Sequence, residues 1–285
     1  MSPPSFSKFN HLAMATEFEL IISLDDEVQA DYAASAAQAV FSEIDRLEDE
    51  LSRFRPMSDI SRIQRLQKGE CIPIGLAAID CLQLAALVQT ETNGAFDISV
   101  GPLMSIFRNQ DGTPRTPQEG EVDEARARVG RPTYRIDDNG FITAEVDFPT
   151  LDLGAIGKGY ALDQAANVLL QWSVSRALLN AGDSTVLALQ PPSGESGWAV
   201  TVGNEQKQVL KLCEHAVSGS GFQVKGGHIM NPRTLEPLPV KPERIWALAP
   251  TAALSDAMST AFAVMEQGEI DELCARIPEI EAIVS

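Results

Sequence analysis

Apolar residues recur every three or four positions along residues 31–54, and this spacing predicts one long amphipathic helix. Acidic residues fill the opposite face. A second helix is predicted over residues 77–94, where Asn93-Gly94 is a typical C-terminal stop. Shorter helices are expected within residues 58–66 and 255–268, the latter closing on Gly268. The apolar face of the first helix consists of Val40, Ile44, Leu47 and Leu51.

Short apolar runs separated by turn residues predict strands. A hairpin is expected over residues 134–144, with Asn139-Gly140 as its turn. Residues 108–133 are polar and rich in glycine and proline, which indicates a surface insertion with one short helix. Because strands and helices do not alternate regularly, the predicted fold class is α+β (mixed α/β) rather than a dinucleotide-binding sheet. The other strands are expected at 18–24, 176–182, 186–190, 198–202 and 244–250.

Composition and charge reduce the number of partner classes that the protein is expected to bind. The chain has 285 residues, 44% of them hydrophobic, and a formal net charge of -18. This charge disfavours nucleic acid and anionic membrane as partners. No signal peptide or membrane span is predicted, so a cytoplasmic location is expected. The four cysteines lack CxxC spacing, which favours free thiols, and the three histidines lack zinc-motif spacing.

The stretch DLGAIGKGYALD, residues 152–163, places Lys158 among three glycines. It fails the P-loop pattern at two of four fixed positions, and it fails the G-x-G-x-x-G pattern. The apolar spacing after it predicts a helix. Glycines that adopt positive φ or approach a ligand, a helix N-terminus and a lysine together favour an anion site. A tight turn with a solvent-exposed lysine is the equally open alternative.

Two further groups carry candidate chemistry. Asp256, Ser259 and Thr260 share one helix face, an all-oxygen set suited to Mg²⁺ or Ca²⁺. Alternatively, Ser255 caps that helix and Asp256 is a first-turn acid complementing the helix dipole. His228, in GGHIMNPRT, is a candidate general base, although a histidine in a loop is more often structural.

Eight sequence blocks occur together in one order along the chain. They are AMATEFEL, DELSRFRPMSDISRI, TNGAFDISVGPL, DLGAIGKGYALD, LLNAGDS, AVSGSG, HIMNPRT and SDAMSTAFAVM. With these blocks the sequence resembles the FAD:protein FMN transferase (ApbE) family. The resemblance runs from about residue 13 to 265, and DLGAIGKGYALD and HIMNPRT are its most specific parts.

The resemblance implies Mg²⁺-dependent transfer of the FMN half of FAD to a threonine or serine hydroxyl of a target protein, with release of AMP. It implies a two-lobed single domain of the T-fold-like ApbE architecture over residues 12–285, with residues 1–11 a flexible N-terminus. The implied catalytic residues are His228, Asp256 and Lys158. The implied metal ligands are Asp256, Ser259, Thr260 and the Ala155 carbonyl. The implied flavin contacts are Met14, Phe54, Ala95, Phe96, Asp97, Asp152, Lys158 and Ile229.

Three positions depart from the family pattern. Asp183 and Leu235 stand where relatives usually carry glycine, and Ser259 stands where many carry an acid. The altered Ser259 and Leu235 motivate one alternative to transfer, a module that only binds FAD. A further alternative is hydrolysis of FAD to FMN and AMP, with water replacing the target hydroxyl. The sequence leaves the target protein and the oligomeric state open.

Overall fold

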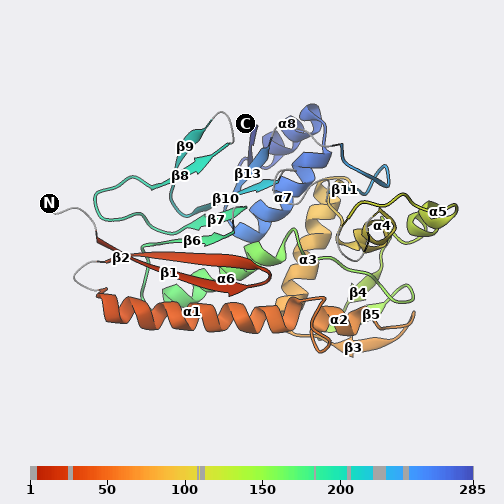
Figure 1. Ribbon diagram of the computed structural model, residues 1–285, viewed down its shortest axis with the longest axis horizontal. Coiled ribbons are helices and arrows are strands. Elements are labelled where there is room, and N and C mark those ends of the chain that lie inside the picture. The colour runs from red at the N-terminus through yellow and green to blue at the C-terminus, as the bar shows by residue number, and fades with distance from the viewer. Residues whose placement is uncertain are drawn as a thin grey trace.

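A seven-stranded antiparallel sheet organises the computed structural model (Figure 1). The structure describes residues 5–24, 28–107, 109, 113–182, 184–203, 207–220, 229–239 and 244–284. Neighbouring strands pair antiparallel throughout this sheet. In spatial order its strands are β1 (Ser5–Ala13), β2 (Thr16–Leu24), β6 (Ala177–Ala181), β7 (Thr185–Ala188), β10 (His215–Ser220), β13 (Ile245–Ala249) and β14 (Glu281–Val284).

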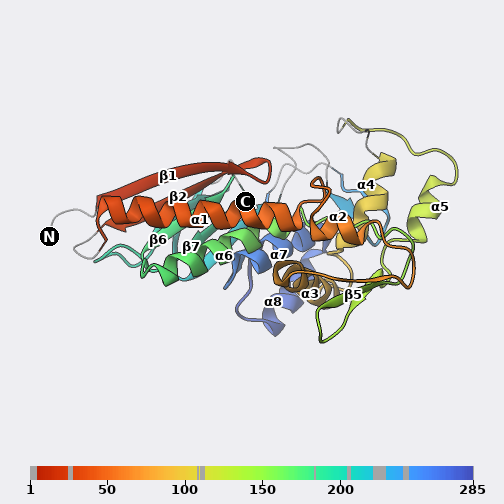
Figure 2. The same cartoon turned by 90° about the horizontal axis from the view of Figure 1, so that it is seen from below.

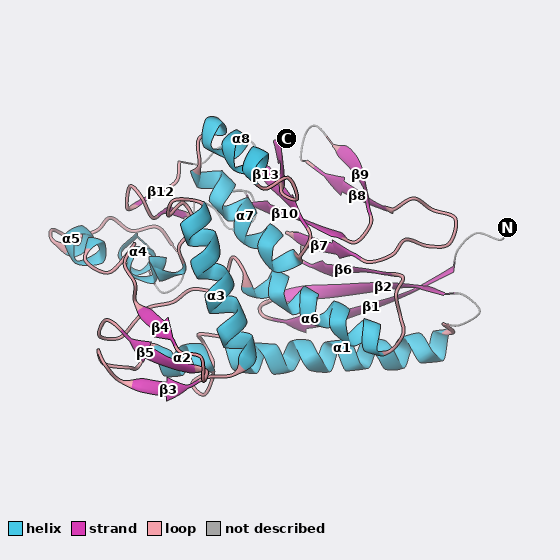
Figure 3. Cartoon of the chain, turned by 180° about the vertical axis from the view of Figure 1, so that it is seen from behind, coloured by secondary structure: helices cyan, strands magenta, loops and turns pink. Residues whose placement is uncertain are grey.

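Three helices cover one face of the sheet, as Figure 3 shows. α1 (Ala30–Leu51) packs on β1 and β2, α6 (Gly157–Gln171) on β6 and β7, and α7 (Ala252–Val264) on β10 and β13. α3 (Leu76–Glu91) packs against α1 and α7. The predicted apolar face of α1 is buried in the main core between these helices and the sheet. Figure 2 shows α1 lying along the β1–β2 hairpin.

The hairpin of β8 (Trp198–Val202) and β9 (Gln208–Leu212) covers the other face, where Trp198 and Val202 pack against Val217 and Trp246. Most of the remaining elements lie toward one end of the molecule (Figure 1). They are α2 (Asp59–Ile63), β3 (Cys71–Pro73), η1 (Ile98–Val100), α4 (Gly101–Phe107), α5 (Glu121–Arg126), β4 (Tyr134–Ile136), β5 (Phe141–Ala144), β11 (Met230–Asn231) and β12 (Glu236–Pro237). The last helix, α8 (Gln267–Arg276), lies beside β14 instead.

The α+β class is confirmed, as are the 134–144 hairpin and the short helix of the insertion. Residues 5–11, expected to be flexible, instead form most of β1. This edge strand pairs with β2 along its whole length, so the boundary expected at residue 12 falls inside a strand. Among the described residues no helix is long and apolar enough to cross a membrane.

The helix predicted over 255–268 is displaced. α7 begins three residues earlier, at Ala252, and its N-cap is Thr251, whose side chain accepts a hydrogen bond from Leu254 N. Gly268 does not end it, because α7 stops at Val264 and Gly268 lies in the first turn of α8. Ser255 is therefore not the N-cap. Its hydroxyl instead donates to the Ala247 carbonyl at 2.8 Å and ties α7 to β13.

Candidate flavin and metal site

Lys158 and Asp256 meet where α6 and α7 cross. Lys158 lies in the first turn of α6, and its Nζ donates to the Gly154 carbonyl at 2.9 Å and lies 3.3 Å from Asp256 Oδ2. Asp256 is buried, with 5% of its surface exposed. A carboxylate removed from water needs a cationic partner, and the ammonium supplies one. Lys158 is therefore not the solvated lysine of the alternative interpretation.

Gly159 of this stretch serves packing, and none of its three glycines has left-handed backbone. Gly154, Gly157 and Gly159 are not among the residues with positive φ, so that expectation is wrong. A Cβ on Gly159 would lie 2.2 Å from the Ala252 carbonyl oxygen and 2.7 Å from Ala253 Cα. Gly159 thus lets the start of α6 approach the backbone of α7 directly.

Three hydroxyls lie together one turn along α7. Ser220 Oγ, at the end of β10, is 2.8 Å from Ser259 Oγ and 3.1 Å from Thr260 Oγ1. Ser259 is fully buried and also donates to the Asp256 carbonyl at 2.9 Å. The sequence interpretation missed Ser220, although AVSGSG was one of the matching blocks. Asp256, Ser259 and Thr260 share a helix face as predicted.

Asp163, the last residue of the stretch, accepts hydrogen bonds from the first two backbone N–H groups of α7. Burial raises the pKa of Asp163 to about 6; the two backbone hydrogen bonds oppose this rise, and the nearby charge of Asp256 adds to it. The sequence analysis assigned no role to Asp163. No pattern in the neighbouring sequence indicates that a carboxylate will cap a different helix.

Asp152 connects this junction to the loop after α1. Its Oδ1 accepts the Gly154 N–H at 2.8 Å, and its Oδ2 is 3.2 Å from Arg53 Nη1. The Arg53 guanidinium lies over the Phe54 ring at 4.8 Å from its centroid. The ring is 81% exposed, so it offers a free aromatic face. Sequence reasoning also missed Arg53, which neighbours a predicted contact.

Ala95, Phe96 and Asp97 follow the end of α3 and are all buried. The Phe96 ring is 3% exposed and belongs to the main core, so it presents no free face for stacking, unlike Phe54. The Asp97 carboxylate accepts the backbone N–H groups of Ser99 and Gly130 at 2.7 and 3.0 Å. In this structure Asp97 therefore caps η1.

Met14 occupies the two-residue turn of the β1–β2 hairpin. Met14 and its neighbour Ala15 have φ of 49° and 57°, and Ala13 pairs with Thr16, which is the geometry of a type I′ turn. Side chains other than glycine, asparagine or aspartate are uncommon in this region, and such strain concentrates at functional sites. The half-buried Met14 packs against the main core.

His228 lies outside the described residues, as does Asp183. The neighbouring Ile229 is buried, and its carbonyl accepts the Leu238 N–H at 2.9 Å. In the following turn, Asn231 Oδ1 accepts the N–H groups of Arg233 and Thr234. Arg233 then bonds to Glu269 of α8 and to the Thr92 and Asn93 carbonyls. The NPRT segment is therefore fastened to α3 and α8.

Leu235 ends this turn with φ of 64°, in the region that favours glycine. Its side chain is 7% exposed and packs in a small core with Leu103 and Met230. Leucine is therefore tolerated here because its side chain is buried, although its backbone conformation is strained.

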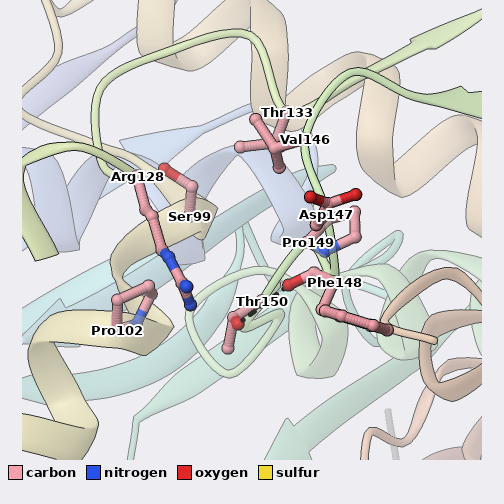
Figure 4. A pocket seen from close by; sticks show the side chains of 9 residues that line it. All are labelled: Ser99, Pro102, Arg128, Thr133, Val146, Asp147, Phe148, Pro149 and Thr150. Carbon is pink, nitrogen blue, oxygen red and sulfur yellow. Dashed lines mark hydrogen bonds between the residues drawn. The ribbon is translucent and has the colours of Figure 1, made fainter. Parts of the chain in front are cut away.

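Two cavities lie away from the Lys158–Asp256 pair. One, of about 10 Å³, is drawn in Figure 4, where Ser99 faces it from η1 and Thr150 from the segment after β5. It has about the volume of one water, and the buried Ser99 hydroxyl has no partner among the described residues. The other, of about 710 Å³, lies between α3 and α6 and is bordered by Asp80 and Asp163. Neither is lined by a predicted flavin contact.

The donor set around Asp256 fits a hard divalent cation bound together with a phosphate ligand. In the part of the chain that the structure describes, no three histidine, cysteine or acidic side chains are placed so that they could hold a metal ion together. Mg²⁺ commonly takes one or two carboxylates from the protein and completes its octahedron with phosphate oxygens and waters. One buried carboxylate with neighbouring hydroxyls is such a set.

Comparison of the sequence with known proteins identifies the family to which the chain belongs. A sequence model of the ApbE family matches residues 14–284, nearly the whole chain. The chain belongs to the ApbE family. It is 28% identical over 271 residues to an FAD:protein FMN transferase of Klebsiella pneumoniae (strain 342), covering 88% of this chain and 76% of that one. It is 25% identical over 269 residues to the Escherichia coli (strain K12) protein of the same name, covering 87% and 76%.

Solved structures show the same ApbE fold. The flavin transferase ApbE of Vibrio cholerae superimposes with a TM-score of 0.86 at 17% identity, covering 99% of this chain and 94% of that one. The ApbE protein of Thermotoga maritima gives 0.83 at 24% identity, covering 98% and 94%. The predicted ApbE architecture is thereby confirmed, whereas identities at this level leave the site residues to be argued from chemistry.

Proposed function

We propose that this protein transfers the FMN moiety of FAD to a threonine or serine hydroxyl of a target protein, with Mg²⁺, and releases AMP. Membership of the ApbE family supports the reaction class. The observation that carries the proposal is the ion pair between the half-buried Lys158, at the start of α6, and the buried Asp256 of α7. It joins a helix N-terminus, a cation and a metal-binding carboxylate, which are the groups that a pyrophosphate needs.

The reaction is a displacement at phosphorus. The acceptor hydroxyl oxygen bonds to the phosphorus on the FMN side, the bond from that phosphorus to the bridging oxygen breaks, and AMP leaves with that oxygen. The hydroxyl proton passes to a base, for which we propose His228. Such transfers depend mainly on alignment and charge neutralisation, so fixed charges beside the pyrophosphate matter most.

Lys158 and the first N–H groups of α6 are proposed to hold the pyrophosphate. In the structure the Lys158 ammonium neutralises the charge of the Asp256 carboxylate. With Mg²⁺ bound to that carboxylate, the ammonium would be free to pair with a phosphate oxygen. We propose Asp256, Thr260 and the Ala155 carbonyl as the metal-holding groups. Ser259 is the weaker candidate because it is fully buried and its hydroxyl already donates to the Asp256 carbonyl. When bound, Mg²⁺ neutralises charge on the leaving phosphate.

The aromatic rings of the substrate need flat apolar surfaces. Phe54 supplies an exposed ring backed by Arg53, which itself pairs with Asp152 beside the Lys158 turn. This chain of contacts runs from the proposed pyrophosphate position to a stacking surface, so we propose Phe54 as the stacking residue. Phe96 is buried in the core, so it would support the residues that contact the ligand rather than contact the ligand itself.

The test is co-expression of the chain with proteins of its source, followed by mass spectrometry for FMN on threonine or serine. AMP release from FAD is measured on the purified protein with and without Mg²⁺. Labelled protein together with Mg²⁺-dependent AMP release supports transfer. AMP without any labelled protein indicates hydrolysis, and tightly bound, intact FAD indicates a binding module. Either of these results replaces the proposal.

A further inference from the structure

The first turn of α7 is held by a side chain from another helix. Asp163 Oδ1 accepts the Ala252 N–H at 2.7 Å, and Asp163 Oδ2 accepts the Ala253 N–H at 2.9 Å. The helix's own cap, Thr251, serves only the next N–H group, that of Leu254, at 3.3 Å. Two of the four free N–H groups that begin every helix therefore depend on a residue 89 positions away in sequence.

We propose that Asp163 is a positioning residue that sets α7 against α6 and thereby holds Asp256 beside Lys158. The inference rests on the proposed function, because it assigns Asp163 a part in that same site. The hydrogen bonds described for Asp163 go to the Ala252 and Ala253 N–H groups, not to a predicted flavin contact or a metal-holding group. It acts through the backbone of α7.

Three contacts along α6 fix this alignment. Lys158 pairs with Asp256, Gly159 lies directly against Ala252, and Asp163 binds the N–H groups that begin α7. The Gly159 contact sets how closely the helices approach. The Asp163 contact, with one oxygen on each of two successive N–H groups, sets the rotation and register of α7. Together these contacts hold the backbone of α7 at Asp256 in register with Lys158.

Accepting both of these N–H groups requires a carboxylate. An asparagine has one acceptor oxygen, so its amide nitrogen would face the second N–H group. Asp80 and Glu214 border the same cavity, so Asp163 stands among other acidic residues. A side chain chosen only to fill this space or to stabilise the fold would not need to be an acid.

Asp163→Asn is the test variant, and Asp80→Asn is its matched control. Asp80 borders the same cavity and accepts the Tyr160 hydroxyl hydrogen bond at 2.9 Å, so it also contacts α6 but not the start of α7. We measure hydrogen exchange of the Ala252 and Ala253 amides in the full-length protein. We also measure kcat and KM for FAD in AMP release with Mg²⁺.

For Asp163→Asn we expect about tenfold faster exchange at those two amides or more. We also expect a fall in kcat of about tenfold to a hundredfold, because a shift of about 1 Å costs that much in an aligned site. The KM for FAD should change far less. Asp80→Asn should leave both readouts near wild type. Thr251→Ala should speed exchange at Leu254 without lowering kcat.

Unchanged exchange in Asp163→Asn overturns the inference, and so does an equal loss of kcat in Asp163→Asn and Asp80→Asn. If Asp163→Asn fails to fold, Asp163→Glu keeps the charge and moves it by one methylene. A native-like melting temperature with wild-type kcat in that variant would overturn the inference. Absence of AMP release and of labelled target in the wild type is a failure of the proposed function. The exchange comparison still decides whether Asp163 holds α7.

Discussion

Gly159→Ala tests whether the close approach of α6 and α7 sets the geometry of the site. The added Cβ would lie 2.2 Å from the Ala252 oxygen, and ordinary contact begins at 3.4 Å, so the start of α7 must retreat by about 1.2 Å. The atoms it meets are backbone and cannot rotate away. Overpacking of this kind costs about 1–3 kcal/mol, which lowers Tm by about 2–10 °C. A retreat of that size should lower kcat about a hundredfold.

Gly157→Ala is the matched control in the same motif. Its Cβ would meet only Leu153 Cβ, at 3.7 Å, which is ordinary contact. Since alanine favours helix over glycine, this variant should unfold at the wild-type temperature or slightly above, a gain of up to about 1 kcal/mol. Thermal unfolding and AMP release measured on both variants provide the comparison. Equal Tm values for the two variants, or a fully active Gly159→Ala, would refute the reasoning.

Three further predictions follow from single observations. Leu235→Gly should be more stable than Leu235→Ala by about 1 kcal/mol in denaturant unfolding, because only glycine relieves the strain of the positive φ. Alanine variants are usually the more stable, and that order here would contradict the prediction. Phe54→Ala should weaken FAD binding about tenfold in fluorescence titration and leave Tm within about 1 °C, since the ring is 81% exposed; unchanged affinity would remove Phe54 from the site. In metal-free buffer, Asp163 takes up its proton more readily in the folded protein than in the unfolded chain, so stability should fall as pH rises from about 4 through about 6. The fall is on the order of 3 kcal/mol, and Asp163→Asn should reduce it; an equal slope in both proteins would contradict the assignment.

Periodicity was sufficient for the long helices and for half of the strands in the described residues. The stripe of Val40, Ile44, Leu47 and Leu51 predicted the buried face of α1 because a 22-residue helix repeats its signal many times. β1 escaped prediction because it is an edge strand with few buried positions. β10 escaped because its serines and glycine do not favour strands, yet Gly219 is required where a Cβ would meet the Trp246 ring.

The site was predictable in its residue types but not in its contacts. Lys158 and Asp256 were both proposed from sequence, and the structure brings them to 3.3 Å. Nothing in either segment indicated that they would meet each other. The roles of Asp163 and Ser220 depend on elements distant in sequence, and such pairings have no local pattern.

The most direct test of the account compares wild type and Asp256→Asn for FMN attached to threonine or serine of co-expressed proteins. The exchange of one oxygen for an amide keeps the volume of this buried side chain but removes the charge that we propose for metal binding. We expect labelled protein with the wild type and none above background with the variant, at similar folded yields. Labelling that persists in Asp256→Asn, or a wild type that binds FAD yet never labels a protein or releases AMP, would contradict the account.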